Sequence, residues 1–183
     1  MKRNIIALVL IIIAVFVAYN GIDIQTVDEY YLTHLDDVKS DSETVFLSIR
    51  CDTVLNNYDL LDESLKSKEY IPADGVILPR TRYVLRDGDS VFDILLRSTR
   101  FNKIQLEYKG NPLQGQSGVY VKGIHFLYEF SCGPLSGWLF KINGVFASGN
   151  SSDYAIKDGD VIEWVYSCDL GRDVGNGYGE DSN

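Results

Sequence analysis

Histidine, methionine and cysteine are scarce in this chain of 183 residues, which contains two, one and three of them. Two histidines cannot supply the usual zinc sites, and the sequence holds neither an HExxH motif nor paired CxxC motifs. A GxSxG elbow, a Walker loop and a GxGxxG motif are also missing. The sequence therefore predicts a protein that is not an enzyme. The alternative it leaves open is a hydrolase with a carboxylate pair, which only the fold would assemble.

Basic residues are too few to balance the acids. Lysine and arginine number 17 against 26 aspartates and glutamates, which gives a net charge of −9. Binding to nucleic-acid phosphates needs stripes of lysine and arginine, so the sequence argues against nucleic acid as a partner. The acidic excess serves solubility or attracts cations. With 45% hydrophobic residues, the chain is able to bury a core.

Charged residues are also nearly missing from the N-terminus, where Lys2 and Arg3 precede an unbroken apolar run over residues 5–18. This layout is typical of a secretory signal or a signal anchor, and it places residues 25–183 outside the membrane. The run is short for a spanning helix, but no small-x-small cleavage site follows it. We therefore predict a signal peptide or signal anchor over residues 1–24. The protein is expected to be extracellular, either anchored in the membrane at the cell surface or secreted.

The rest of the chain divides into a stalk, a domain and a tail. Residues 25–43 are polar, and their apolar residues recur at helical spacing, which predicts a stalk with a helix over 26–39. The folded domain is expected over residues 44–174. The glycine-rich, acidic residues 175–183 are expected to form a disordered tail.

Alternation of apolar and polar residues predicts β-strands through most of the domain. Ser90 and Asp93 fit the capping box of one helix that ends near Arg100. Asn143-Gly144 is typical of a two-residue hairpin turn. The pattern predicts an α+β fold, a β-grasp-like mixed sheet with one packed helix, preceded by an N-terminal membrane or signal helix. The expected strands are 44–50, 76–78, 81–85, 104–108, 119–122, 138–142, 145–147, 154–156 and 161–166, with a short helix around 62–68 and irregular structure over 123–137.

Three segments, taken in order, resemble the transcobalamin-like C-terminal domain family. They are residues 87–95 (DGDSVFDIL), 133–144 (GPLSGWLFKING) and 154–164 (YAIKDGDVIEW). The resemblance covers roughly residues 44–174. In the animal cobalamin carriers, the similar domain is a small β-rich lobe that covers one face of the corrinoid, whereas the bacterial relatives are mostly surface domains. The resemblance implies a bacterial surface protein with a β-rich binding domain.

The cysteines and some of the acids are expected to meet if the domain is a β-grasp. Its first and last strands would then run parallel and adjacent, which favours a disulfide between Cys51 and Cys168 and leaves Cys132 buried or paired between molecules. Three buried thiols are the alternative. The same bridge would gather Asp52, Asp169 and Asp173, whose carboxylates are candidate calcium ligands.

Aromatic residues are the best candidates for binding a ligand. In one interpretation the aromatic faces of the strands form the core. In the other, Trp138 and the hairpin tip form a flat apolar platform for a ligand or a partner. The candidate ligand-binding residues are Trp138, Phe140, Asn143, Gly144, Phe146, Tyr128 and Tyr154.

Two functions follow from these observations. The first is a non-enzymatic extracellular domain on a bacterial surface that binds a small molecule, such as a corrinoid or another bulky planar ligand. The alternative is a protein-interaction or surface-assembly module, stabilised by a cation such as calcium. In both cases the N-terminal helix brings the chain to the membrane.

Overall fold

The computed structural model describes residues 37–110 and 118–177, and the structural statements below concern these residues. The chain divides into two units, Met1–Leu35 and Asp36–Asn183, and all described residues fall in the second. The predicted signal or anchor helix and almost all of the predicted stalk helix lie outside them. Within the described ranges, no helix has the length and apolar character needed to cross a membrane.

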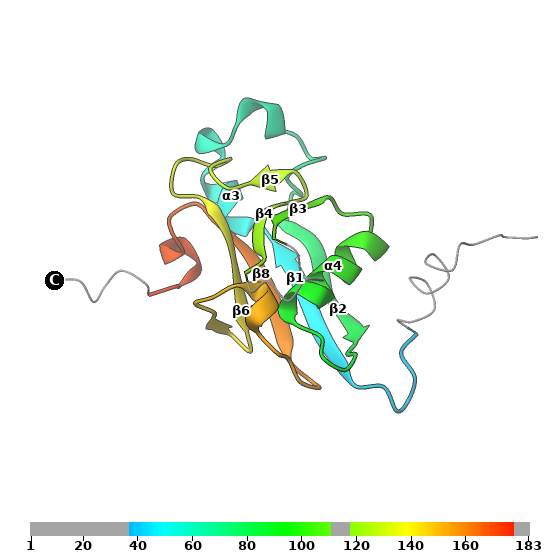
Figure 1. Ribbon diagram of the computed structural model, residues 1–183. Coiled ribbons are helices and arrows are strands. Elements are labelled where there is room, and N and C mark those ends of the chain that lie inside the picture. The colour runs from blue at the N-terminus through cyan, green and yellow to red at the C-terminus, as the bar shows by residue number, and fades with distance from the viewer. Residues whose placement is uncertain (1–36, 111–117, 178–183) are drawn as a thin grey trace, which may run out of the picture. The chain divides into compact units, whose positions relative to one another are not determined.

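The centre of the domain is a mixed five-stranded sheet in the order β2-β1-β8-β6-β7 (Figure 1). β1 pairs with β2 and β8 pairs with β6 in antiparallel fashion, whereas β1 and β8 run parallel. The first and last strands are therefore neighbours at the middle of the sheet, which confirms the predicted α+β, β-grasp-like fold. The strands are β1 (Thr44–Arg50), β2 (Val76–Val84), β6 (Gly137–Ile142), β7 (Val145–Phe146) and β8 (Val161–Ser167).

One main helix, α4 (Val91–Phe101), packs against the sheet and confirms the predicted helix. Its N-terminus is closed by a capping box, in which the Ser90 hydroxyl accepts a bond from the Asp93 N–H and the Asp93 carboxylate accepts one from the Ser90 N–H. The buried residues of α4 are mostly apolar and lie in one cluster with those of β1 and β8.

A second, three-stranded sheet lies beside the first in the order β3-β4-β5, with β4 next to β6. Its strands are β3 (Leu106–Lys109), β4 (Tyr120–Ile124) and β5 (Leu127–Tyr128). The prediction of irregular structure over 123–137 is wrong at β5. The turn before β5 consists of His125 and Phe126, which both adopt positive φ angles, 54° and 64°, that few residues other than glycine and asparagine favour.

The hairpin of β6 and β7 turns at Asn143 and Gly144, whose φ angles of 53° and 81° confirm the predicted turn. The Asn143 side chain also reaches β8, because its oxygen accepts a bond from the Val161 N–H.

The remaining elements are short. The segment 154–156, predicted as a strand, forms only an isolated bridge between Ala155 and Ser90. The two strands predicted before α4 are one strand, β2. The helix predicted around 62–68 is reduced to a 3-10 turn. The short helices are α3 (Asp52–Asn56), η1 (Tyr58–Leu60), η2 (Glu63–Leu65), η4 (Ser151–Asp153) and η5 (Arg172–Val174).

The predicted disulfide between Cys51 and Cys168 is not formed in the structure, where all three cysteines are thiols, and the positions of these two cysteines do not favour it. β1 and β8 run parallel as expected, but their register places Cys51 level with Tyr166, two residues before Cys168. Two residues of strand span about 6.6 Å. The chain also turns into α3 after Cys51, and the Thr53 hydroxyl of this helix lies 3.8 Å from the Cys168 sulfur.

Candidate functional site

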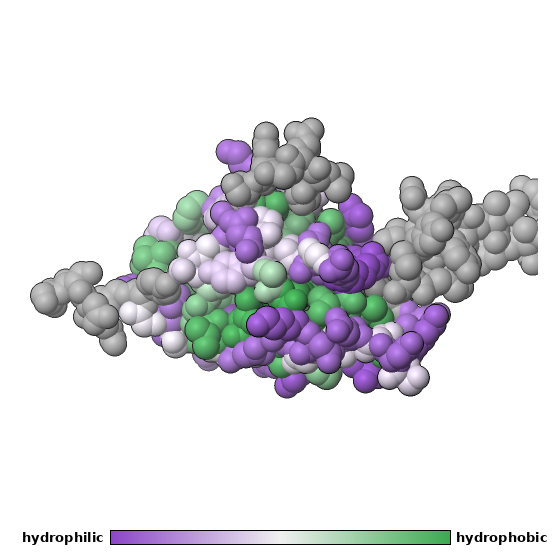
Figure 2. All heavy atoms as spheres, turned by 60° about the horizontal axis from the view of Figure 1, so that its bottom comes forward, coloured by the Kyte–Doolittle hydropathy of each residue, from purple (hydrophilic) through white to green (hydrophobic). Residues whose placement is uncertain are grey.

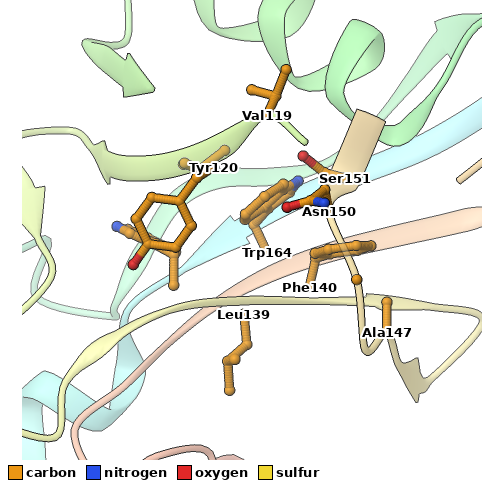
Figure 3. A pocket seen from close by; sticks show the side chains of 11 residues that line it. Val119, Tyr120, Leu139, Phe140, Ala147, Asn150, Ser151 and Trp164 are labelled. Atoms are coloured by element: carbon orange, nitrogen blue, oxygen red, sulfur yellow. The ribbon is translucent and has the colours of Figure 1, made fainter. Parts of the chain in front are cut away.

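A pocket opens between β4 of the small sheet and β6 of the large sheet (Figure 3). Its volume is about 200 Å³. β4 and the residue before it form one wall, β6 forms the other, and the loop from β7 to η4 closes one end. The lining residues are Val119, Tyr120, Val121, Trp138, Leu139, Phe140, Ala147, Gly149, Asn150, Ser151 and Trp164. We call this site the aromatic pocket.

Aromatic rings from the adjacent strands β6 and β8 line the aromatic pocket. Phe140 of β6 lies against Trp164 of β8, with ring centroids 5.1 Å apart, and meets Tyr154 edge-on at 5.4 Å. Trp138 is held separately, because its indole N–H donates a 2.7 Å bond to the Leu127 carbonyl. The rings are thus fixed before any ligand arrives, which lowers the entropy lost on binding.

Two buried polar atoms in the aromatic pocket have no hydrogen-bond partner among the described residues. They are the indole nitrogen of Trp164 and the hydroxyl of Ser151, whose residues are only 3% and 2% exposed. In Figure 3 both side chains border the pocket, and the nitrogen of Trp164 turns toward the side where Ser151 lies. Most buried polar groups in native proteins are paired, so each exception requires an explanation.

The aromatic pocket carries no acidic, basic or histidine side chain among its lining residues. Tyr120 at its rim is 50% exposed, and its hydroxyl donates a hydrogen bond to the carboxylate of Glu129. This bond, together with burial, raises the pKa of Tyr120 to about 12, so its phenol is neutral at physiological pH. The pocket therefore offers flat apolar surface and neutral hydrogen-bonding groups.

The predicted ligand-binding residues do not form one site. Trp138 and Phe140 line the aromatic pocket, and Tyr154 packs against Phe140. At the hairpin tip, the Asn143 amide donates a bond to the Asp160 carboxylate. The other predicted residues also lie outside the aromatic pocket: Gly144 at the tip, Phe146 under the Lys141 ammonium group, and Tyr128 in a different hollow beside Tyr70 and Phe126.

The residues that sequence reasoning missed are Trp164 and Ser151. Strand alternation assigns Trp164 to the core, where it is indeed buried, but alternation does not show that one edge of its ring faces a pocket. Ser151 stands in a polar stretch, GNSSD, which gives no sequence signal that one of its serines is buried.

The predicted calcium ligands are not gathered. Within the described residues there is no group of three or more histidine, cysteine or acidic side chains that is able to hold a metal ion. Asp52 and Asp169 form ion pairs with neighbouring arginines, at 2.6 Å and 2.5 Å. Asp173 instead accepts hydrogen bonds from the Ser167 hydroxyl and the Cys168 N–H. The prediction fails because each carboxylate has a partner close in sequence.

A second hollow of about 290 Å³ adjoins the aromatic pocket and shares Tyr120, Trp138 and Leu139 with it. We call it the neighbouring hollow. Phe130, Leu135 and Leu170 line it and are large apolar residues with exposed fractions of 62%, 40% and 57%.

Two of these exposed residues also have an unusual backbone conformation. Phe130 and Leu170 both have positive φ angles, 68° and 48°, which residues with a Cβ seldom adopt. Backbone strain of this kind persists only where the surrounding structure enforces it, and it occurs often at functional surfaces.

The fold and the pocket together define a small α+β domain with a mixed β-grasp-like sheet and an aromatic pocket at its side. Residues 88–167 match a family model described as "Domain of unknown function (DUF4430)". The match runs from the turn before α4 to the end of β8 and includes every residue that lines the aromatic pocket. No curated protein matches the chain. The matched description names no ligand, and the transcobalamin-like resemblance stays a prediction.

Proposed function

We propose that this protein is a non-enzymatic ligand-binding domain that works outside the cell, with its ligand in the aromatic pocket. The observation that carries the proposal is the pair of unpartnered polar atoms on Trp164 and Ser151. Leaving a buried donor or acceptor unpaired costs about 1–3 kcal/mol. A ligand that satisfies both atoms recovers this free energy on binding. Part of the affinity therefore comes from groups that have no hydrogen-bond partner among the described residues.

The chemistry of the two atoms limits the ligand. The Trp164 nitrogen only donates, so the ligand atom that meets it is an acceptor, such as a carbonyl oxygen or an aromatic ring nitrogen. The Ser151 hydroxyl either donates or accepts. Because no charged side chain lines the aromatic pocket, a charged ligand group would lose its hydration without gaining a counter-ion. The ligand group in the pocket is therefore neutral, flat on one face and equipped with an acceptor.

The volume of the aromatic pocket limits the ligand's size. Pockets for drug-sized molecules usually measure about 300–1,000 Å³, and this one measures about 200 Å³. A corrinoid would place a single neutral substituent inside, such as one of its carboxamide side chains. Its plane would lie outside, against Tyr120 at the rim. A smaller planar amide would enter whole.

The lining residues also support a binding role over catalysis. General acid–base catalysis needs a titratable side chain near the bound molecule, and the aromatic pocket has no carboxylate or histidine. Among the described residues, the Ser151 hydroxyl has no hydrogen-bond partner, and no carboxylate or histidine lines the pocket to activate it as a nucleophile.

Binding is tested by equilibrium dialysis of the full-length chain against cobalamin, cobinamide and benzamide, the last being a small planar carboxamide. We expect saturable binding of at least one probe. Trp164→Phe and Ser151→Ala should each weaken it about tenfold, which is the loss of about 1.4 kcal/mol expected for one hydrogen bond. Trp138→Ala should weaken it further by removing a wall of the pocket.

The matched control is Phe146→Ala, which removes an aromatic ring from the hairpin tip without touching the aromatic pocket. It should leave the affinity unchanged. Binding of benzamide alone would identify a small ligand and reject the corrinoid. Absence of binding of every probe up to about 100 µM, weaker than about −5.5 kcal/mol, would contradict the proposal.

The extracellular location rests on the N-terminal apolar run and has its own test. Protease added to intact cells should degrade the domain, whereas a cytoplasmic control protein should survive. Protection of the domain until the cells are lysed would contradict the location.

A second candidate function is a protein-interaction module, and the neighbouring hollow favours it. Exposed large apolar residues with enforced backbone conformations are typical of contact surfaces. On the face shown in Figure 2, apolar residues form a band bordered by hydrophilic ones. Replacing Phe130 and Leu170 by serine should abolish binding to a partner without changing small-molecule binding. Loss of small-molecule binding with partner binding unchanged would instead assign the neighbouring hollow to the ligand site.

A further inference from the structure

Cys132 and Cys168 belong to one buried cluster in the domain interior, and their sulfur atoms contact residues that lie one helical turn apart. The Cys132 sulfur is 3.4 Å from the Asn57 carbonyl oxygen, and the Cys168 sulfur is 3.8 Å from the Thr53 hydroxyl. Thr53 and Asn57 are themselves neighbours one helical turn apart, joined by a 2.8 Å bond from the Asn57 amide to the Thr53 carbonyl. The two thiols also lie close enough that each affects the pKa of the other.

The backbone around each of these thiols is fixed by its own hydrogen bonds. The Cys132 N–H donates to the Ser136 hydroxyl at 3.0 Å, and the Cys168 N–H donates to the Asp173 carboxylate at 2.7 Å. The strands next to them are paired as well, because Gly137 of β6 lies opposite Ser167 of β8. These hydrogen bonds and the strand pairing hold the backbone near both thiols in place.

Cys51 is buried in the same cluster but has different neighbours. The charged groups that act on its thiol are those of Asp52, Arg50 and Asp74. β1 ends just before it, at Arg50, which is paired with Val165, and the Thr53 side chain lies 3.8 Å from the sulfur of Cys168.

We propose that Cys132 and Cys168 form a disulfide bond when the protein folds in an oxidising compartment, and that Cys51 stays a thiol. The oxidant is a small disulfide such as oxidised glutathione. One cysteine thiolate attacks a sulfur of the small disulfide, and a thiolate of the small molecule leaves. The second cysteine thiolate then attacks the mixed disulfide and releases the second small thiol. One disulfide is consumed and one is formed, with two small thiols as products.

The bond would join two segments that border the neighbouring hollow. Cys132 follows Phe130, and Cys168 precedes Leu170, and both of these apolar residues line the hollow. A covalent link between their segments would fix the positions of the Phe130 and Leu170 side chains relative to each other. The link would form during folding, because burial raises the pKa of both thiols and keeps them protonated in the folded domain.

The test maps the bond in the full-length wild-type chain. The unfolded, reduced protein is refolded in a mixture of reduced and oxidised glutathione, quenched with acid, unfolded, alkylated and digested with trypsin. Trypsin separates the cysteines, because Lys122 and Lys141 flank Cys132, whereas Lys157 and Arg172 flank Cys168. Mass spectrometry should find these two peptides linked, with Cys51 alkylated.

Melting temperatures provide the second measurement. The oxidised protein should melt about 10 °C above the reduced one, as expected for a bond that closes a loop of this length. Cys51→Ala should keep this difference, whereas Cys132→Ala and Cys168→Ala should abolish it. A bridge that contains Cys51, or three fully alkylated cysteines after refolding, would overturn the proposal. The peptide map needs no variant, so misfolding of an alanine variant leaves the test intact.

Discussion

Replacing Ser151 by alanine should make the free protein more stable while it weakens ligand binding. Ser151 is only 2% exposed and its hydroxyl has no partner among the described residues. Removing an unsatisfied buried hydroxyl recovers its desolvation penalty, which is about 1–3 kcal/mol, less a small loss of packing. We expect the free energy of unfolding to rise by about 1 kcal/mol.

Ser136 provides a matched control, because it is equally buried, at 4% exposed, but fully hydrogen-bonded. Its hydroxyl accepts bonds from the Cys132 N–H and the Tyr166 hydroxyl, and it donates to the Gly133 carbonyl, at 3.0, 2.9 and 2.8 Å. Ser136→Ala leaves the Cys132 N–H buried without an acceptor. The same substitution should therefore lower the free energy of unfolding by about 2 kcal/mol.

Urea denaturation of the full-length wild type and both variants, followed by tryptophan fluorescence, measures the two changes. Opposite signs for the two serines would support the assignment of Ser151 to the ligand site. A loss of more than about 0.5 kcal/mol in Ser151→Ala would mean that its hydroxyl is satisfied in the free protein. That result would remove the main support for the proposed pocket.

Three further predictions concern charge, backbone conformation and pH. Asp89→Ala breaks a buried ion pair with Arg97, whose contact is 2.7 Å, and should lower the free energy of unfolding by about 3 kcal/mol. Asp169→Ala breaks an exposed pair and should not change it measurably, and thermal unfolding of both variants measures the difference. Gly144→Ala should lower stability by about 1 kcal/mol because its φ is 81°, whereas Gly137→Ala, with no positive φ and no atom near its added Cβ, should not destabilise. The pKa of Tyr120 is raised to about 12, so the folded state holds the phenolic proton more tightly than the unfolded chain does. The protonated phenol therefore adds to the free energy of unfolding below about pH 10, and this stabilisation is lost as the pH rises toward 12. Absorbance titration should show Glu129→Gln lowering that pKa, and an unchanged value would contradict the hydrogen bond as its cause.

Much of the fold could be predicted because local chemistry dictates it. The capping box of Ser90 and Asp93 and the turn at Asn143-Gly144 each depend on residues a few positions apart. β5 was missed because its turn uses His125 and Phe126, and neither carries the usual signal for a positive φ.

The candidate site was predictable only in part, because it depends on distant pairings. Sequence alternation found Trp138 and Phe140 but not Trp164, because Trp164 joins the pocket lining only once β4 of the small sheet lies next to β6 of the large one. The disulfide prediction failed for a similar reason. Adjacency of β1 and β8 follows from the topology, but the two-residue offset between Cys51 and Cys168 follows from the register.

The central position of β8 determines the order in which the domain is completed. Among the strands of the described residues, β8 comes last in the sequence, yet it lies between β1 and β6 and pairs with both. While the chain is being synthesised, β1 and β6 both present open hydrogen-bonding edges until residues 161–167 emerge. Such long-range closure is slow, and open edges invite aggregation. A chain truncated before Val161 should therefore accumulate as two unjoined halves, however well α4 and the hairpin form by themselves.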